Sequence, residues 1–246
     1  MPESANTAGI VSYERRETPL SEQLPRVTDE KDRPSDNTPT RCAYDLGSPS
    51  RQTMFRRFAQ EALAEYVGGA PRPTRLPTLV QLNVFSALTR NAAALGVSKE
   101  WLADDTISPF SRHGPDLGLF FPGMASSVPY PDSLRPTALQ VAVPHHPWID
   151  LLPIPRLRDN ILCATVEPDA LDEDDLCYDL VEVTGESDKA SLIVWAEPWN
   201  PRGWEVSVAF LRKWGWLLKG CPEILEATNY WREKRGEKRL AFTLQC

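Results

Sequence analysis

A regular spacing of apolar residues near the C-terminus is the strongest constraint on how this chain can fold. In the segment GWEVSVAFLRKWGWLLKG they recur three or four residues apart, the spacing of one helical face, at Trp204, Val208, Leu211, Trp214 or Gly215, and Leu218. Gly220 predicts the end of this helix. Pro222 and Gly236 bracket a second helix, PEILEATNYWREKRG, because proline suits the first helical turn and glycine the position after the last. We therefore expect a tight pair of helices.

Two further helices are expected in the first half of the chain. The segment QTMFRRFAQEALAEYVGG ends in two glycines and is amphipathic, with one face formed by Phe55, Phe58, Ala62, Leu63 and Tyr66. The segment TLVQLNVFSALTRNAAALG ends at Gly96 and has helical spacing at Leu82, Phe85, Leu88, Ala92 and Leu95. A Pro-rich connector, APRPTRLP, separates the two.

The remaining segments are short and interrupted by proline. Helical pieces are expected at Leu139 to Val143, in RLRDNILCATV and in DDLCYDLVEV, and a brief buried strand at Leu192 to Trp195. Residues 97–135 are rich in Pro, Gly and Ser and predict a long loop. The predicted fold class is mainly α, an irregular helical domain with long Pro-rich loops and at most a short strand region.

The first 50 residues differ in composition from the rest of the chain. They contain six prolines and only six Leu, Ile, Val or Phe residues. So few apolar groups cannot offset the entropy of ordering the chain. We expect residues 1–50 to be a disordered tail and residues 51–246 to be a helical domain.

Charge and cysteine content restrict the partners and the compartment. The net charge of -7 argues against broad wrapping of nucleic acid, which depends on neutralised phosphates. Five cysteines without a CxxC pair indicate free thiols in a reducing compartment. No signal peptide and no apolar run of membrane-spanning length is found, so a soluble protein of the nucleus or cytoplasm is expected.

The segment PHHPWIDLLPIPRLRDN, residues 144–160, concentrates the residue types used in chemistry. A metal site would join His145 or His146 to Cys163 and Cys177. Adjacent side chains of an extended segment point to opposite faces, and the interval between the cysteines is unlike that of zinc sites. We therefore expect no metal, with one histidine in the core and the other near solvent.

Acid–base catalysis is the second hypothesis for this segment. His146 titrates near neutrality, and Asp150 or Asp159 could fix its tautomer, with Arg158 as a further catalytic candidate. The structural alternative is that these charges form ion pairs and helix caps. Candidates for ligand or partner contact are His145, Trp148, Arg156, Trp195, Trp199 and Trp214.

Other known signatures of function are missing or weak. The chain has no GxSxG serine, GxGxxG dinucleotide or HExxH zinc motif, and no cofactor is predicted. The segment WREKRGEKR could touch phosphate, but cations at a helix end also oppose the helix dipole. Direct binding of DNA is therefore not expected.

Long ordered phrases nevertheless resemble a known family. They are NVFSALTRNAAALGVS, LRPTALQVAVPHHPWIDLLPIPRLRDNIL and LIVWAEPWNPRGWEVSVAFLRKWGWLLKGCPEILEATNYWREKRGE. Together, over about residues 75–240, they resemble the C-terminal domain of unknown function found in fungal basic leucine-zipper (bZIP) transcription factors. The basic helix and leucine heptad of a bZIP reader are missing before residue 75.

This resemblance implies a regulator or interaction protein of a filamentous fungus, in some cases tied to a secondary-metabolite gene cluster. Its expected partner is a transcription factor or co-regulator, with a small-molecule ligand as a further option. The alternative is an enzyme or small-molecule-handling protein of a biosynthetic pathway, with a site around His145 and His146. We favour the regulatory interpretation over the enzyme, by analogy with the family.

Overall fold

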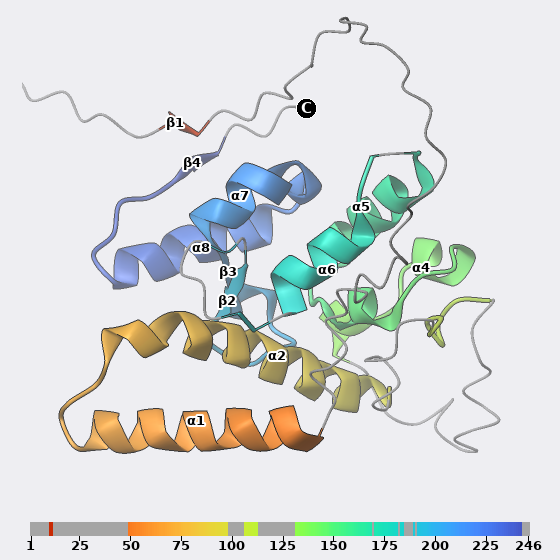
Figure 1. Ribbon diagram of the computed structural model, residues 1–246. Helices are drawn as coiled ribbons and strands as arrows, with labels where there is room; N and C mark the ends of the chain where they lie inside the picture. Colours follow the sequence, from red (N-terminus) through yellow and green to blue (C-terminus); the bar gives the residue numbers. More distant parts are fainter. Residues whose placement is uncertain are drawn as a thin grey trace, which may run out of the picture.

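The computed structural model describes residues 10–11, 49–97, 106–112, 131–168, 170–181, 183–184, 189 and 191–242, and their fold is mainly α. The α-helices are α1 Pro49–Val67, α2 Leu76–Leu95, α4 Ala138–Ala142, α5 Pro155–Val166, α6 Glu173–Val181, α7 Val208–Trp214 and α8 Pro222–Lys234 (Figure 1). Short 3-10 helices are η2 Pro73–Arg75, η5 Asp132–Leu134, η6 Pro147–Leu151, η7 Pro201–Gly203 and η8 Gly215–Leu218. The strands are β1 Ile10–Val11, β2 Leu192–Val194, β3 Trp204–Val206 and β4 Ala241–Phe242. The predicted fold class is thereby confirmed.

Most of the expected tail lies outside the described residues. Within it, only the two-residue strand β1 and the first residues of α1 are described. β1 pairs in parallel with β4, with Ile10 opposite Ala241. The greater part of the predicted loop over residues 97–135 also lies outside the described residues. The disordered tail therefore remains a prediction.

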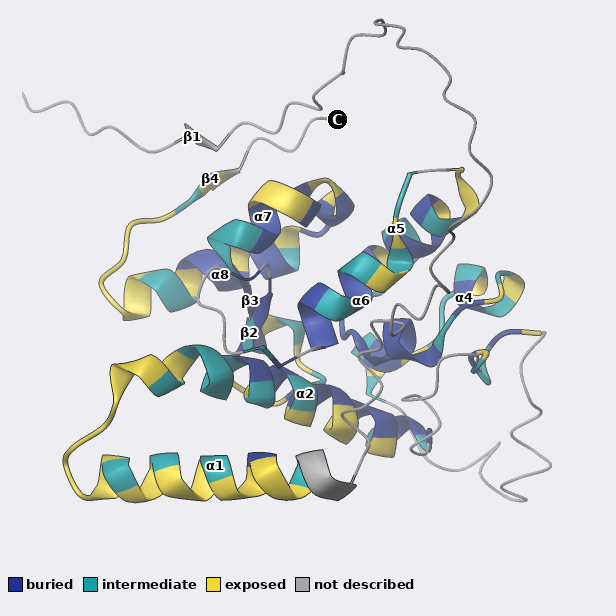
Figure 2. Cartoon of the chain, viewed as in Figure 1, coloured by how far each residue is buried: buried dark blue, intermediate teal, exposed yellow. Residues whose placement is uncertain are grey.

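The first two helices form a hairpin, and a glycine follows the end of each helix. Gly69 and Gly96 have φ angles of 75° and 70°, the left-handed conformation that suits glycine after a helix. α1 contributes Phe55 to the core, whereas Leu63 and Tyr66 on the same predicted face are exposed. Figure 2 accordingly shows α1 as mostly exposed and α2 as partly buried. The hairpin therefore leaves much of its apolar surface uncovered.

The predicted start of the C-terminal helix pair is wrong. Trp204 to Val206 form strand β3, antiparallel to β2, with Val206 opposite Leu192. All three residues of β3 are buried, because α8 packs on this strand while α2 packs on β2. Helix α7 begins only after Ser207, whose hydroxyl accepts a hydrogen bond from the Phe210 N–H at 3.0 Å. The apolar residues at helical spacing therefore divide between strand β3, the shorter helix α7 and the 3-10 helix η8.

The second helix of the pair lies as predicted. α8 begins at Pro222, and Gly236, with a φ angle of 74°, follows its end. Around the β2–β3 pair, α2, α5, α7 and α8 enclose one apolar core (Figures 1 and 2). Its largest fully buried side chains include Trp148, Trp204 and Phe210. This core holds the segment of residues 144–160 in place.

Candidate functional site

His145 and Asp150 form a buried pair. Pro147 opens the 3-10 helix η6, which turns the chain so that Asp150 faces back toward His145. The Nε2 atom of His145 lies 2.8 Å from Asp150 Oδ1, and its Nδ1 atom lies 2.7 Å from the Val143 carbonyl oxygen. Both partners are acceptors, so both ring nitrogens donate and the imidazole is protonated.

The environment of His145 favours that protonated form. Burial alone lowers the pKa of His145, but the hydrogen bond and charge of Asp150, with the carbonyl of Val143, raise it above its ordinary value. Glu173 adds a smaller attraction. Burial raises the pKa of Glu173 itself, and a hydrogen bond from Trp148 offsets part of this effect. The pair is a charged unit inside the protein.

Asp150 is the acceptor at the centre of this network. Besides His145, it accepts hydrogen bonds from Ser108 Oγ at 2.6 Å and from Gln140 Nε2 at 2.5 Å. The side chains of His145 and Asp150 are each only 1% exposed. In a catalytic triad the histidine lies between serine and carboxylate, whereas here the carboxylate lies between serine and histidine. The arrangement therefore does not activate Ser108 as a nucleophile.

Arg158 extends the network to the neighbouring loops. Its guanidinium is fully buried and donates to Gln140 Oε1 at 2.9 Å and to the carbonyl oxygens of Ser133, Leu152 and Arg135. Burial lowers the pKa of Arg158 to about 10, although Asp150 partly opposes this effect. Four protein acceptors take the place of water around this charge. Arg158 therefore links the loops before α4 and α5 to the core.

The other residues predicted in this segment lie at its edges. His146 is half-buried and caps η6, its Nδ1 accepting from the Trp148 N–H at 3.4 Å. Asp159 accepts from the Thr137 hydroxyl at 2.5 Å. Trp148 is buried, and Arg156 is exposed beside Gly220. The structure thus brings together His145, Asp150 and Arg158, and places the remaining candidates around them.

The three tryptophans predicted as contact residues have separate surroundings. Trp195 stacks on Trp231 with ring centroids 5.5 Å apart and is 42% exposed. Trp199 lies under the guanidinium of Arg90. Trp214 is buried, and its indole N–H donates to Asp179 Oδ2 at 2.8 Å. Their role in contacting a ligand or partner remains a prediction.

The described residues do not form a metal site of the kind considered from the sequence. No group of three or more His, Cys, Asp or Glu side chains is suitably placed among the residues that the structure describes. Of the cysteines weighed as ligands, Cys163 is exposed and Cys177 is buried. Within the same part of the chain, no helix is both long and apolar enough to cross a membrane.

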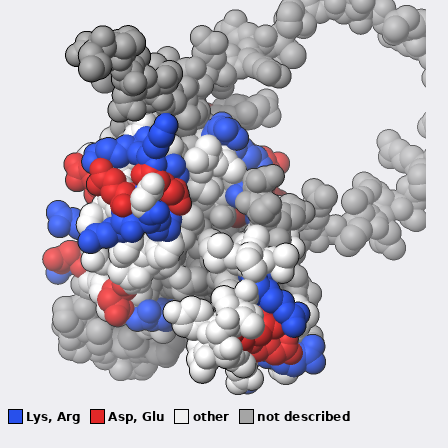
Figure 3. Space-filling model, turned by 90° about the vertical axis from the view of Figure 1, so that its left-hand side faces the viewer, with Lys and Arg blue, Asp and Glu red and all other residues white. Residues whose placement is uncertain are grey.

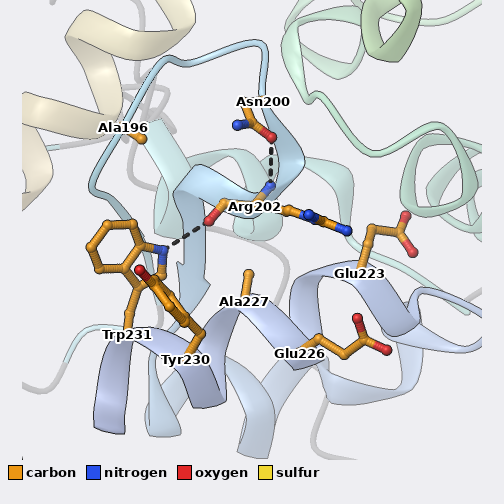
Figure 4. Close-up of a pocket in the computed structure, with 8 residues that line it drawn as sticks. All are labelled: Ala196, Asn200, Arg202, Glu223, Glu226, Ala227, Tyr230 and Trp231. Carbon is orange, nitrogen blue, oxygen red and sulfur yellow. Dashed lines mark hydrogen bonds between the residues drawn. The ribbon is translucent and has the colours of Figure 1, made fainter. Parts of the chain in front are cut away.

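Two surface cavities lie away from the histidines. One, of about 460 Å³, is formed by α8, η7 and the loop after β2, and Figure 4 shows its lining. The rings of Tyr230 and Trp231 meet edge to face at 5.1 Å, and the Trp231 indole donates to the Arg202 carbonyl oxygen at 2.8 Å. Glu223 and Glu226 project from α8 on the opposite side of the opening. The cavity offers both signs of charge beside an aromatic wall.

The second cavity, of about 550 Å³, lies between α1 and α2. Its lining is mainly apolar and includes Leu63, Tyr66, Leu76 and Leu79. Sequence reasoning missed this groove, because the pattern shows which residues share a helical face but not whether another element covers it.

Reasoning from sequence also missed Ser108 and Gln140 in the buried network. The sequence Thr137-x-x-Gln140 does carry a signal, since it is a capping box, and both of its hydrogen bonds are present.

One family model matches the central part of the chain. Residues 123–225 match the family model DUF3425, a domain of unknown function. The resemblance to a domain of unknown function is thereby confirmed, over a shorter range than the expected residues 75–240. Neither a curated protein nor a solved structure matches the chain. The DUF3425 segment contains the buried network around Asp150, apart from Ser108, whereas the α1–α2 hairpin precedes it.

Proposed function

We propose that this protein is a regulatory interaction module that modulates transcription by binding a partner transcription factor or co-regulator. The observation that carries the proposal is the contrast between its buried polar network and its exposed apolar side chains. His145, Asp150 and Arg158, the residues best suited to chemistry, are buried and hydrogen-bonded to neighbouring side chains or backbone. Large apolar side chains are instead exposed on the α1–α2 hairpin. An exposed apolar patch is typical of a protein-binding surface.

The cationic cluster at the end of α8 supports protein binding over direct DNA binding. Arg232 and Arg235 pair with Glu237, and Arg239 pairs with Glu233 at 2.6 Å. These neighbouring carboxylates neutralise much of the positive charge of the segment. Affinity for DNA depends on cations that remain available for phosphate.

A tethering experiment tests the proposal. The full chain is fused to a heterologous DNA-binding domain and placed upstream of a reporter gene in a filamentous fungus. We expect reporter transcription to change several-fold relative to the DNA-binding domain alone. A fusion that reaches the nucleus and leaves transcription unchanged would contradict a regulatory role.

A second candidate function is the handling of a small molecule in the cavity beside α8. Its support is the set of charged and aromatic side chains in one opening, where Glu223 and Glu226 suit a cationic group and Arg202 an anionic one. A zwitterionic ligand such as a free amino acid fits this set. Calorimetric titration with a panel of amino acids would test it, and binding that survives Glu226→Gln together with Tyr230→Ala would count against this cavity.

A further inference from the structure

The apolar groove between α1 and α2 is open to solvent and bordered by exposed side chains. Leu63, Tyr66 and Val67 of α1 are 62%, 71% and 78% exposed, and Leu76 of α2 is 61% exposed. Positions 63, 66 and 67 are neighbours on a helix surface, so they form one continuous strip along the groove. Burying such side chains releases about 25 cal/mol for each Å² of apolar surface. The strip therefore favours a partner with an apolar face.

The charge around the groove is opposite in sign to that of the whole chain. Residues 49–79 contain five arginines, two glutamates and no other charged residue, whereas the net charge of the chain is -7. Figure 3 views the molecule from the side of this hairpin and shows basic and acidic side chains beside uncharged surface in its lower part. The hairpin is a locally basic unit on an acidic protein.

Ion pairs within the hairpin do not neutralise this excess. Glu61 pairs with Arg57 and Arg75, and Glu65 pairs with Arg72 and Arg75. Both carboxylates are therefore shared between two guanidinium groups. The side chains of Arg57 and Arg72 remain 76% and 66% exposed. Arg72 also lines the groove, so this cation can accept a further anionic partner at its edge.

One polar atom at the groove also lacks a partner. Glu65 Oε2 is buried and receives no hydrogen bond from the described residues. Oε1 of the same carboxylate forms ion pairs with Arg72 and Arg75. An unsatisfied buried acceptor costs about 1–3 kcal/mol. A segment that supplied an N–H or O–H group at this point would remove that cost.

We propose that the α1–α2 groove binds an acidic amphipathic helix of a partner protein, an inference that rests on the proposed interaction function. The apolar face of such a helix would cover Leu63, Tyr66 and Leu76. Its flanking carboxylates would pair with Arg72, since helix-in-groove recognition combines apolar anchors with charges at the rim. A second copy of this chain fits less well, because a two-fold contact would bring two arginine-rich rims together.

The test uses the full chain and three synthetic helical peptides of about 18 residues, a length that gives five turns for groove binding. All three carry leucine at the same amphipathic positions, with glutamate, glutamine or lysine on the polar face. Fluorescence anisotropy measures binding at low and at high salt. We expect the glutamate peptide to bind most tightly and to weaken as salt rises, and the lysine peptide to bind at least tenfold more weakly. Equal binding of all three would overturn the proposed charge preference.

Variants locate the binding surface. The double substitution Leu63→Asp and Leu76→Asp changes exposed positions and should lower affinity for the glutamate peptide at least tenfold. Val166→Asp, at a 65% exposed apolar residue of α5, is the matched control and should leave affinity unchanged. Circular dichroism confirms that both variants fold. Undiminished binding by the double variant would overturn the proposal.

Two further measurements exclude other occupants of the groove. Sedimentation that showed a dimer abolished by the double variant would assign the groove to a second copy. Binding to anionic lipid vesicles through Leu63 and Leu76, without binding of the glutamate peptide, would assign it to a membrane surface. Either outcome overturns the proposed partner. If the tethered chain regulates the reporter and the double variant does so equally well, the groove proposal fails while the proposed function stands.

Discussion

At the scale of single residues, the segment around His145 shows how groups suited to catalysis can be used for structure. The same three residue types, histidine, aspartate and serine, would suggest hydrolysis if they were read without geometry. Their order of contact and their burial instead make Asp150 the common acceptor of three donors. Removing one partner of a buried ion pair leaves the other charge buried and uncompensated, which strongly destabilises the folded protein.

Replacing Asp150 by asparagine should strongly destabilise the protein. The substitution removes the counter-charge that is hydrogen-bonded to the protonated His145, and breaking a buried pair in this way costs about 3–5 kcal/mol of unfolding free energy. Ser108→Ala removes only one of the three donors to Asp150 and should cost less, about 1–3 kcal/mol. Urea unfolding followed by circular dichroism measures both. Equal losses in the two variants would contradict the central role of the Asp150 charge.

The stability of the protein should fall as the pH rises above neutrality. The pKa of His145 is raised in the folded protein from its ordinary value of 6.5. A raised pKa contributes stability that is fully present below 6.5 and is lost as the pH rises through the folded-state value. His145→Gln should remove this dependence in unfolding curves measured from about pH 6 to 9. Glu233→Gln serves as the control, because this carboxylate pairs with Arg239 on the surface, away from His145.

At the scale of elements, the junction between β3 and α8 depends on one partly buried ion pair. Glu205 of β3 is buried and accepts from Arg235 Nη1 and Nη2, just after α8, at 2.8 and 2.7 Å. Trp195 donates its indole N–H to the same carboxylate at 2.7 Å. The hydrogen bonds of Glu205 raise the pKa of Arg235. The pair thus joins the short sheet to the last helix.

Arg235→Ala should therefore destabilise the protein much more than Arg239→Ala. Loss of Arg235 leaves the Glu205 carboxylate buried with a single donor, at a cost of about 3 kcal/mol. Arg239 pairs with Glu233 on the surface, where such pairs contribute about 0–1 kcal/mol. Thermal and urea unfolding of the two variants give the comparison. Similar stability in both would contradict the structural importance of the buried pair.

The same region shows which elements sequence reasoning can predict. Helix α8 was predictable because Pro222 and Gly236 mark its two ends locally. Strand β3 was not, since Trp204 and Val208 also fit a helical repeat. Residues 204–206 form a strand because they pair with β2, and the local sequence pattern gives no information about this contact between segments. Ser207 was the available signal, because an N-cap residue there places the helix start after the strand.

At the scale of the whole molecule, the candidate site illustrates a similar limit. The sequence singled out His145, Asp150 and Arg158 as neighbours in one short segment. It could not supply Ser108, because the hydrogen bond from Ser108 to Asp150 spans 42 residues. Burial decides whether such a cluster serves chemistry or structure, and burial depends on how the helices pack around it. The open α1–α2 groove could not be predicted from the sequence for the same reason.

The N-terminal residues should contribute little to the stability of this packed unit. The apolar core is built from residues beginning at Phe55, and the described pairing of residues 1–48 with the rest of the chain is that of the two-residue strand β1 with β4, which lies outside this core. A pairing of this size contributes about 1–3 kcal/mol at most, because each hydrogen bond adds only about 1 kcal/mol. Deletion of residues 1–48 should therefore preserve cooperative unfolding and lower its free energy by no more than this amount.

A second deletion separates the effect of that strand pairing from any other role of the N-terminal residues. Removing residues 241–246 eliminates β4 and hence the same pairing, while Leu240 keeps its hydrogen bonds to Asn229. The two deletions should then show equal urea midpoints, because each removes the same small ladder. A much larger loss on deleting residues 1–48 would mean that these residues cover part of the core or the α1–α2 groove. In that case the domain would begin before residue 51, and the exposed strip on α1 would have an occupant within its own chain.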